Sequence, residues 1–108
     1  MELSVLDRVI ITKALLPETG TIEQIKLVIS LKNKIGFSRE ELQSLRITSP
    51  AKGVIELPHL TEDMKNRVIQ YFITPEELEL LKLFANAFNQ NGWVTPTSLD
   101  TIEYLLNN

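Results

Sequence analysis

The chain has 108 residues, of which 44% are hydrophobic and 23% are charged, and its formal net charge at pH 7 is −3. These values are typical of one globular domain (1–108) that buries a core without a metal or disulfides. The absence of cysteine excludes a disulfide framework, a thiolate nucleophile and a cysteine-based metal site. No stretch approaches the roughly 20 apolar residues that a membrane-spanning helix needs, so we expect a cytoplasmic protein without membrane contact.

The first expected element is a helix over 3–16, because its apolar density is typical of a buried helix. The β-branched run at 9–11 leaves a strand as the alternative there. Pro17 bars continuation, since proline lacks a backbone N–H and disfavours the helical conformation of the residue before it. Residues 18–20 are expected to form a turn.

A long second helix is predicted from Thr21 to Gly36. Thr21 is expected to cap its start, with Gln24 completing a capping box, and Gly36 to end it in the left-handed conformation. Its apolar residues, which include Leu27 and Leu31, spread over more than half of the circumference, whereas a surface helix carries a stripe of about 100° or somewhat more. We therefore expect this to be the central helix, packed on two sides.

The next helix starts at Ser38, because Glu41 completes a second capping box and Phe37 and Leu42 can form a hydrophobic staple. Residues 47–57 then change character. Apolar residues flank a turn-forming Ser-Pro-Ala-Lys-Gly segment, which predicts a short β-hairpin or an extended excursion.

Thr61 is expected to open another helix, with acidic residues favourably placed at its positive end. The spacing of Met64, Val68, Ile69 and Phe72 predicts the apolar face of that helix. The helix would accordingly extend to about residue 72.

Thr74 is expected to cap the following helix, with Pro75 at the favoured first position and Gly92 at its end. A last helix is predicted to start at 95–96 (Thr-Pro). Together the elements predict a mainly α fold. It is a compact bundle of five or six helices with a possible short β-hairpin at about 47–57.

Charge is distributed unevenly along the chain. Residues 26–52 carry a balance of +4, whereas residues 53–108 carry −5 and residues 1–25 carry −2. A positive middle third can contact polyanions, and the order of elements over 3–57 is that of a winged helix-turn-helix. In that alternative, nucleic acid would be contacted by Lys32, Lys34, Arg39, Arg46 and Lys52.

The helix that would read DNA argues against this alternative. Glu40 and Glu41 stand at the end that should meet phosphates and base edges, where cationic or amide side chains are needed. Residues 25–45 also resemble, locally, a helix pair of mercury-resistance-type regulators, but the matched pair is not the base-reading helix of that family. Nucleic acid is therefore a disfavoured partner.

The sequence contains little that points to catalysis. His59 is the single histidine and could pair with Glu62 or Asp63, but a metal site needs more ligands and a general base needs a substrate pocket. No phosphate-binding loop, dinucleotide fingerprint or nucleophile elbow is present. We expect no enzyme, no cofactor and no metal.

The first 45 residues resemble small proteins of unknown function encoded by bacteriophages and prophages. That family opens with a Val-Leu-x-Arg helix, followed by a Leu-Pro-x-x-Gly turn, a long helix and Phe-Ser-x-Glu-Glu. The matching positions are Val5, Leu6, Arg8, Leu16, Pro17, Gly20, Phe37, Ser38, Glu40 and Glu41. The resemblance implies a compact helical accessory protein without catalytic residues. Residues 16–20 spell LPETG, which matches a sortase signal. The resemblance implies that this stretch is a structural turn instead.

The function predicted on this basis is a non-enzymatic protein–protein interaction or accessory module, working as a homo-oligomer or with a protein partner. Leu27, Leu31, Leu80 and Leu83 widen the apolar stripes of two helices and are the predicted protein interface. In the alternative interpretation, these leucines complete a two-sided core.

Overall fold

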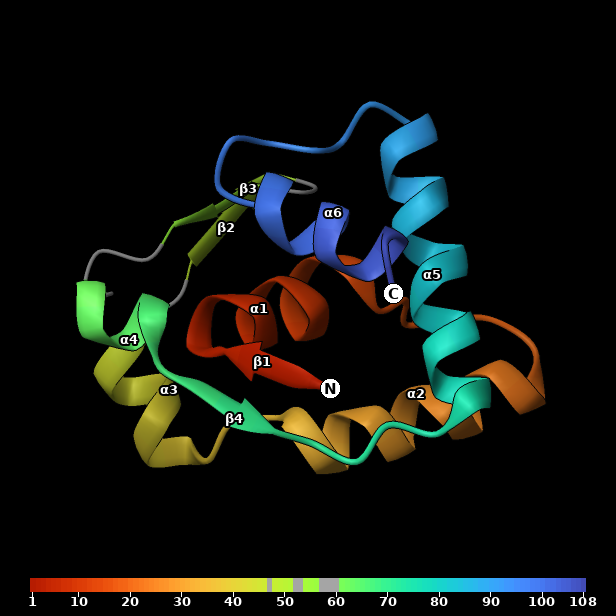
Figure 1. Ribbon diagram of the computed structural model, residues 1–108, viewed down its shortest axis with the longest axis horizontal. Helices are drawn as coiled ribbons and strands as arrows, with labels where there is room; N and C mark the ends of the chain where they lie inside the picture. The colour runs from red at the N-terminus through yellow and green to blue at the C-terminus, as the bar shows by residue number, and fades with distance from the viewer. Residues whose placement is uncertain (47, 52–53, 57–60) are drawn as a thin grey trace.

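The computed structural model describes residues 1–46, 48–51, 54–56 and 61–108. Figure 1 shows the elements, which are β1 (Glu2–Ser4), α1 (Val5–Val9), the π-helical η1 (Ile10–Leu15), α2 (Ile22–Ile35), α3 (Arg39–Leu45), β2 (Thr48–Ala51), β3 (Val54–Glu56), α4 (Glu62–Asn66), β4 (Val68–Gln70), α5 (Pro75–Gln90) and α6 (Leu99–Leu106). The predicted mainly α fold is confirmed.

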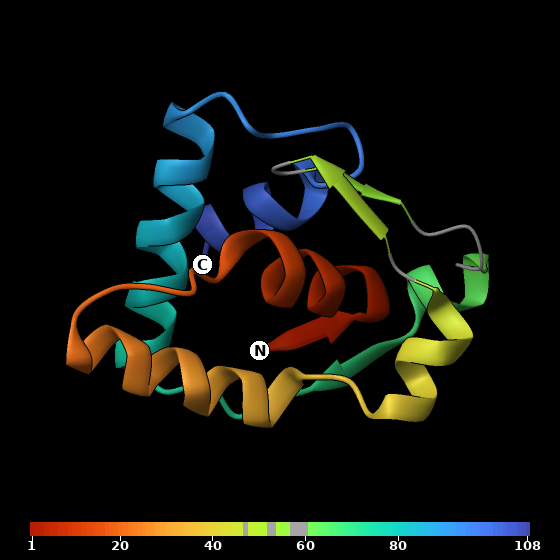
Figure 2. The same cartoon turned by 180° about the vertical axis from the view of Figure 1, so that it is seen from behind.

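The centre of the fold is α1 with its continuation η1, which lies between α2 and α6 in both views (Figures 1 and 2). Val9, Ile10 and Ile11 have no exposed surface. The prediction that α2 is central is wrong, because its Ile22 and Ile29 are 77% and 54% exposed. The wide apolar arc of α2 contacts the core on one side only.

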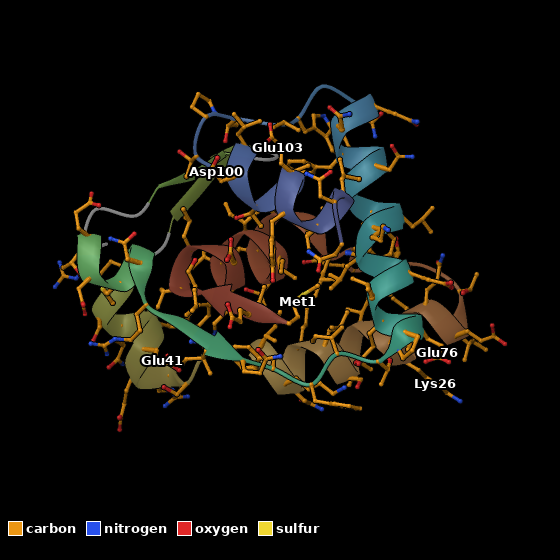
Figure 3. All side chains as sticks on the ribbon, in the orientation of Figure 1. Met1, Lys26, Glu41, Glu76, Asp100 and Glu103 are labelled. Carbon is orange, nitrogen blue, oxygen red and sulfur yellow. The ribbon has the colours of Figure 1, made fainter. Side chains whose placement is uncertain are left out.

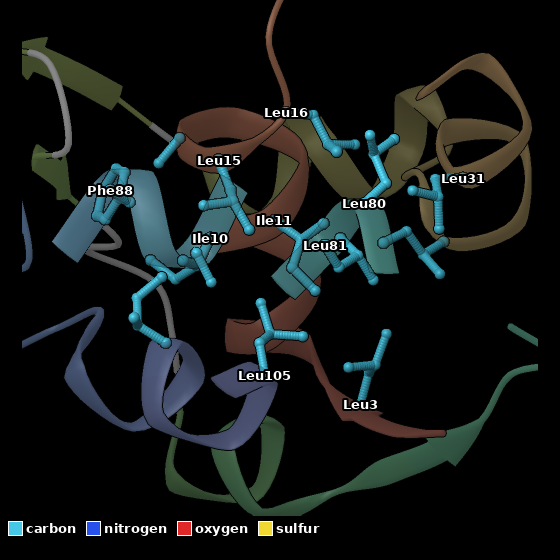
Figure 4. Packing of buried hydrophobic residues seen from close by; sticks show 14 of the residues in the cluster. Leu3, Ile10, Ile11, Leu15, Leu16, Leu31, Leu80, Leu81, Phe88 and Leu105 are labelled. Carbon is cyan, nitrogen blue, oxygen red and sulfur yellow. The ribbon is translucent and has the colours of Figure 1, made fainter. Parts of the chain in front are cut away.

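The hydrophobic core joins β1, α1, η1, α2, α5 and α6 (Figure 4). Its buried members are Leu3, Val9, Ile10, Ile11, Ala14, Leu15, Leu16, Val28, Leu31, Ile35, Leu80, Leu81, Ala85, Phe88, Ile102 and Leu105. Most of these come from the first helix and from α5. The two terminal parts of the chain therefore enclose the same core.

The segment after α4 differs from its prediction. α4 is capped by Thr61 as expected, but it ends at Asn66, and β4 follows as a strand. β4 pairs antiparallel with β1, with Leu3 opposite Ile69. The β-branched and aromatic run over 68–73 favours a strand once a partner strand is available.

The predicted hairpin is present. β2 and β3 pair antiparallel, with Thr48 opposite Glu56 and Ala51 opposite Val54. Residues 47, 52–53 and 57, which complete the predicted 47–57 segment, lie outside the described residues.

The helix starts follow the sequence closely. The predicted capping boxes at Thr21 and Ser38 form, and Thr74 caps α5 as predicted, in a capping box with Glu77. The last helix is an exception, because α6 begins at Leu99 rather than directly after residue 96. Hydrogen bonds between Thr95 and Ser98 hold a turn before it.

Gly36 ends α2 for a reason that differs from the prediction. Its φ of −66° and ψ of 168° are extended rather than left-handed. The Gly36 N–H donates to the Lys32 carbonyl at 2.8 Å, and a Cβ on Gly36 would overlap that oxygen. Close backbone approach therefore requires the glycine. Gly92, after α5, does have a positive φ of 71°.

Arg8 on α1 is 7% exposed and ties α1 to the end of α2. Its Nε donates to the Ile35 carbonyl at 2.9 Å and its Nη2 donates to the Gly36 carbonyl at 2.8 Å. These carbonyls belong to the last turn of α2, where no intrahelical donor remains and a positive charge is favourable. The guanidinium thus acts as the C-terminal cap of α2.

The same guanidinium contacts two further parts of the chain. Its Nη1 donates to Glu41 Oε2 on α3 at 3.3 Å. Its central carbon lies 4.1 Å from the ring centroid of Phe37 and 5.8 Å from that of Tyr71. One side chain therefore holds α1, α2, α3 and the segment after β4 together.

A second polar link joins the ends of the chain. Asp7 caps α1 together with Ser4, accepting from the Ser4 N–H at 2.9 Å. The other carboxylate oxygen of Asp7 accepts from the Thr101 hydroxyl on α6 at 2.6 Å. The start of α1 is thereby fixed against α6.

We expect Arg8→Met to lower the free energy of unfolding by about 2–4 kcal/mol, because two carbonyl groups lose their donor while the apolar stem is kept. The matched control is Arg39→Met at the exposed start of α3, which should stay within about 0.5 kcal/mol of the wild type. Urea unfolding followed by circular dichroism measures both variants. Equal stability of the two would contradict the role assigned to Arg8.

The two glycines should respond differently to asparagine. Gly92→Asn keeps a residue that tolerates positive φ and has open space around it, so we expect little change in stability. Gly36→Asn should cost about 1–3 kcal/mol, because its Cβ overlaps the Lys32 carbonyl. Thermal unfolding of both variants checks the order. A tolerated Gly36→Asn would mean that the backbone relaxes freely there.

Candidate functional site

Two of the five cations predicted to contact nucleic acid point in different directions. Lys34 Nζ lies 2.5 Å from Glu77 Oε1 on α5 and 5.5 Å from the ring centroid of Phe72. Lys32 stands two positions earlier on α2, so its side chain leaves the helix about 200° away from that of Lys34. It is exposed. The five cations therefore do not share one face.

Two of the remaining predicted cations lie at the ends of a helix whose first turn is acidic. Arg39 and Arg46 are exposed at opposite ends of α3, and Lys52 lies outside the described residues. Glu40 and Glu41 stand in the first turn of α3, and Figure 3 shows Glu41 at the α3 end of the molecule. Phosphate contact at this helix start would have to overcome two carboxylates.

The four leucines of the predicted protein interface separate into core and surface. Leu31 and Leu80 are 0% and 6% exposed and belong to the core, and Leu27 is partly buried against it. These three leucines therefore match the alternative interpretation, in which the leucines complete the core. Leu83 on α5 is 54% exposed.

A shallow pocket lies between α1, α3 and α4. It is lined by Val5, Ser38, Glu40, Glu41, Ser44 and Met64. A hydrogen bond from the Ser38 N–H lowers the pKa of Glu41, partial burial raises it, and the Arg8 charge lowers it again, so the pKa is below 4.5 overall. A carboxylate that is ionised and engaged in this way is a poor proton donor at neutral pH.

Two further predictions concern chemistry. His59 lies outside the described residues, so the structure does not show whether it approaches a carboxylate. Within the described part of the chain, no group of three or more potential ligands could hold a metal ion.

One exposed backbone edge that the sequence does not predict is the outer side of β4. Within the described residues, β4 pairs with β1 alone. Tyr71 and Met1 exchange two hydrogen bonds, at 2.8 and 2.9 Å. Because bonded and non-bonded pairs alternate in an antiparallel ladder, Leu3 and Ile69 form the next bonded pair. The N–H and C=O groups of Val68 and Gln70 therefore point away from β1.

The side chains along this edge are apolar and exposed. Val68 is 50% exposed, Ile69 is 49% exposed and Phe72 is 81% exposed. Ile69 lies opposite Leu3, whose side chain is buried, so it points toward the core side of the sheet and stays half-exposed because the sheet ends there. We call residues 68–72 the β4 edge.

The β4 edge is anchored from beneath. Tyr71 lies on the same face as Ile69, is partly buried against the core, and has its ring within 5.8 Å of the Arg8 guanidinium. Phe72 points to the other face, beside Lys34. The contact of Arg8 with Tyr71 and the contact of Lys34 with Phe72 thus position an exposed apolar strand.

The sequence signal for this site is ambiguous between a helix and a strand. Val68, Ile69 and Phe72 fit the apolar face of a helix started at Thr61. The same run is rich in β-branched and aromatic residues, which is typical of a strand. The presence of β1, more than 60 residues away in sequence, decides between the two.

Comparison with known proteins found no family model, no curated protein and no solved structure that matches the chain. The resemblance of the first 45 residues to phage and prophage proteins therefore stays a prediction. None of the described helices is long and apolar enough to cross a membrane.

The buried carboxylate of Glu77 predicts a pH dependence. Burial raises the pKa of Glu77, but hydrogen bonds from Lys34, from the Thr74 backbone and from Ser30 lower it by more, so its pKa lies below 4.5. A folded-state pKa below the unfolded value stabilises the fold above about pH 4.5, and this contribution is lost as pH falls through the folded-state pKa.

We therefore expect Glu77→Gln to be less stable than the wild type at pH 6 to 7, with a difference that shrinks as pH falls below about 4.5. Urea unfolding at several pH values measures it. Glu79→Gln, on the exposed side of α5, is the matched control and should show no such trend. A difference between wild type and Glu77→Gln that is independent of pH would contradict this account.

Proposed function

We propose that this chain is a non-enzymatic protein-interaction module whose β4 edge accepts an extended segment of a protein partner. The observation that carries the proposal is the combination of outward-pointing backbone groups at Val68 and Gln70 with exposed apolar side chains at Ile69 and Phe72. An added strand would satisfy the backbone groups and cover the side chains at once.

The composition of the edge supports this interpretation. Soluble proteins commonly protect edge strands with charged residues, proline or a covering element. Residues 68–73 contain neither a charge nor a proline, and the side chains of Val68 and Ile69 stay half-exposed. Main-chain hydrogen bonds would supply affinity, and the alternating side chains would supply specificity.

The proposal replaces the predicted leucine interface as the site, because Leu31 and Leu80 are buried. It retains the predicted class of function, a protein-binding accessory module. An origin in a phage or prophage is part of the proposal and rests on the resemblance alone. The nucleic-acid alternative lacks a shared cationic face.

The experiment uses a fluorescent synthetic peptide with the sequence of residues 66–74 (NRVIQYFIT) as an extended apolar probe. We expect saturable binding to the wild-type protein by fluorescence anisotropy, and none for a scrambled peptide. Val68→Pro should weaken binding at least tenfold, because it removes an outward N–H but spares the bonds to β1. Arg67, before it, already has φ −75° and ψ 120°, which suits a residue preceding proline.

The matched control is Leu83→Lys, which removes another exposed apolar side chain, on α5, and should bind the peptide like the wild type. Circular dichroism must show that both variants are folded. Equal binding by Val68→Pro, or no binding by the wild type, would refute the β4 edge as a docking site. Salt-sensitive binding of a random-sequence DNA duplex in place of the peptide would support the winged-helix alternative.

A further inference from the structure

The proposed function leaves the partner open, and the β4 edge itself indicates one. We propose that two copies of this chain pair through their β4 edges, antiparallel about a two-fold axis, with Gln70 opposite Gln70 of the second copy. This inference rests on the proposed function. The result would be one continuous sheet in the order β1, β4, β4 of the second copy, β1 of the second copy.

Backbone geometry restricts the ways in which two such edges can pair. The outward N–H and C=O groups belong to Val68 and Gln70. Pairing that includes Phe72 requires the strand alternation to continue two residues beyond the end of β4. A two-fold axis makes the contact self-complementary, so that if residue i meets residue j, then j meets i. Pairing centred on Gln70 therefore sets Val68 of each copy opposite Phe72 of the other.

The side chains favour this register. Val68 and Phe72 point to the same face of the sheet, so the pair joins a half-exposed β-branched side chain with an aromatic ring that is 81% exposed. On the opposite face, Ile69 meets Tyr71 of the second copy. Pairs of aromatic and β-branched residues are among the stabilising cross-strand contacts. All three exposed apolar residues of the edge thus gain an apolar partner.

The registers shifted toward α4 fit less well. Centring on Ile69 would set Val68 opposite Gln70 and Phe72 opposite Asn66, which ends α4. Centring on Val68 would bring Asn66 opposite Gln70. Either choice pushes α4 into the strand pair, so that the Phe72 ring faces a helical residue instead of a strand residue.

The charge distribution agrees with a second copy as the occupant. Each chain carries a net charge of −3, which opposes association of two copies, so the contact surface itself must add no further like-charge repulsion. Residues 68–73 are uncharged, and no like charges face each other in the Gln70-centred register. Arg67 is held by Asp63 at 2.8 Å within its own chain and would lie opposite Ile73 of the second copy.

A strand pair of this length buries a small area, so we expect a monomer–dimer equilibrium rather than a permanent dimer. Sedimentation velocity of the wild type from micromolar to millimolar concentration should show a reversible shift from monomer to dimer. Gln70→Pro removes the two central N–H donors and should remain monomeric over the same range. Leu83→Lys should dimerise like the wild type.

The register is tested by single cysteines, since the chain has none of its own. Opposite residues in a bonded antiparallel pair have Cα atoms about 5.5 Å apart, which is within the range of a disulfide. Under mild oxidation Gln70→Cys should form a covalent dimer at least tenfold faster than Asn86→Cys, on the exposed side of α5. Faster cross-linking of Ile69→Cys than of Gln70→Cys would overturn the register.

The two proposals fail separately. If the wild type stays monomeric at every concentration and Gln70→Cys cross-links no faster than Asn86→Cys, then self-pairing is overturned. Binding of the 66–74 peptide in that case would keep the β4 edge as a docking site for a different protein. If the peptide does not bind either, then the proposed function also fails.

Discussion

The fold depends on one buried cation. A guanidinium in the interior is stable only if its charge and its donors are matched, and Arg8 meets this condition with the last carbonyls of α2, with Glu41 and with the Phe37 ring. These partners come from the end of α2, the loop after it and the start of α3. Arg8 on α1 therefore sets the direction in which the chain leaves α2.

The other buried polar groups serve the same purpose at different places. Glu77 joins α5 to α2 through Lys34 and Ser30, and Asp7 joins α1 to α6 through Thr101. No buried side-chain nitrogen or oxygen in the described residues lacks a partner. Each of these buried polar groups thus joins two helices. The candidate site lies elsewhere, on the surface.

The candidate site follows from this arrangement of the core. Because Leu31 and Leu80 fill the interior, the apolar surface that remains uncovered includes the strand that the sheet leaves open at its side. Tyr71 holds that strand to Arg8 from beneath, while Phe72 beside it faces solvent. The same short segment is thereby rigid enough to present backbone groups and exposed enough to pair with another chain.

The helix starts at Thr21, Ser38 and Thr74 are predictable from local sequence, because a capping box needs only residues three positions apart. The sequence also indicated the mainly α class and the 47–57 hairpin, which depend on local periodicity and turn chemistry. The central position of the first helix, the extended conformation of Gly36 and the strand at Val68–Gln70 are not predictable in this way. Each of these depends on contacts between distant segments, above all β1 with β4 and Arg8 with α2, and local patterns carry no information about such contacts.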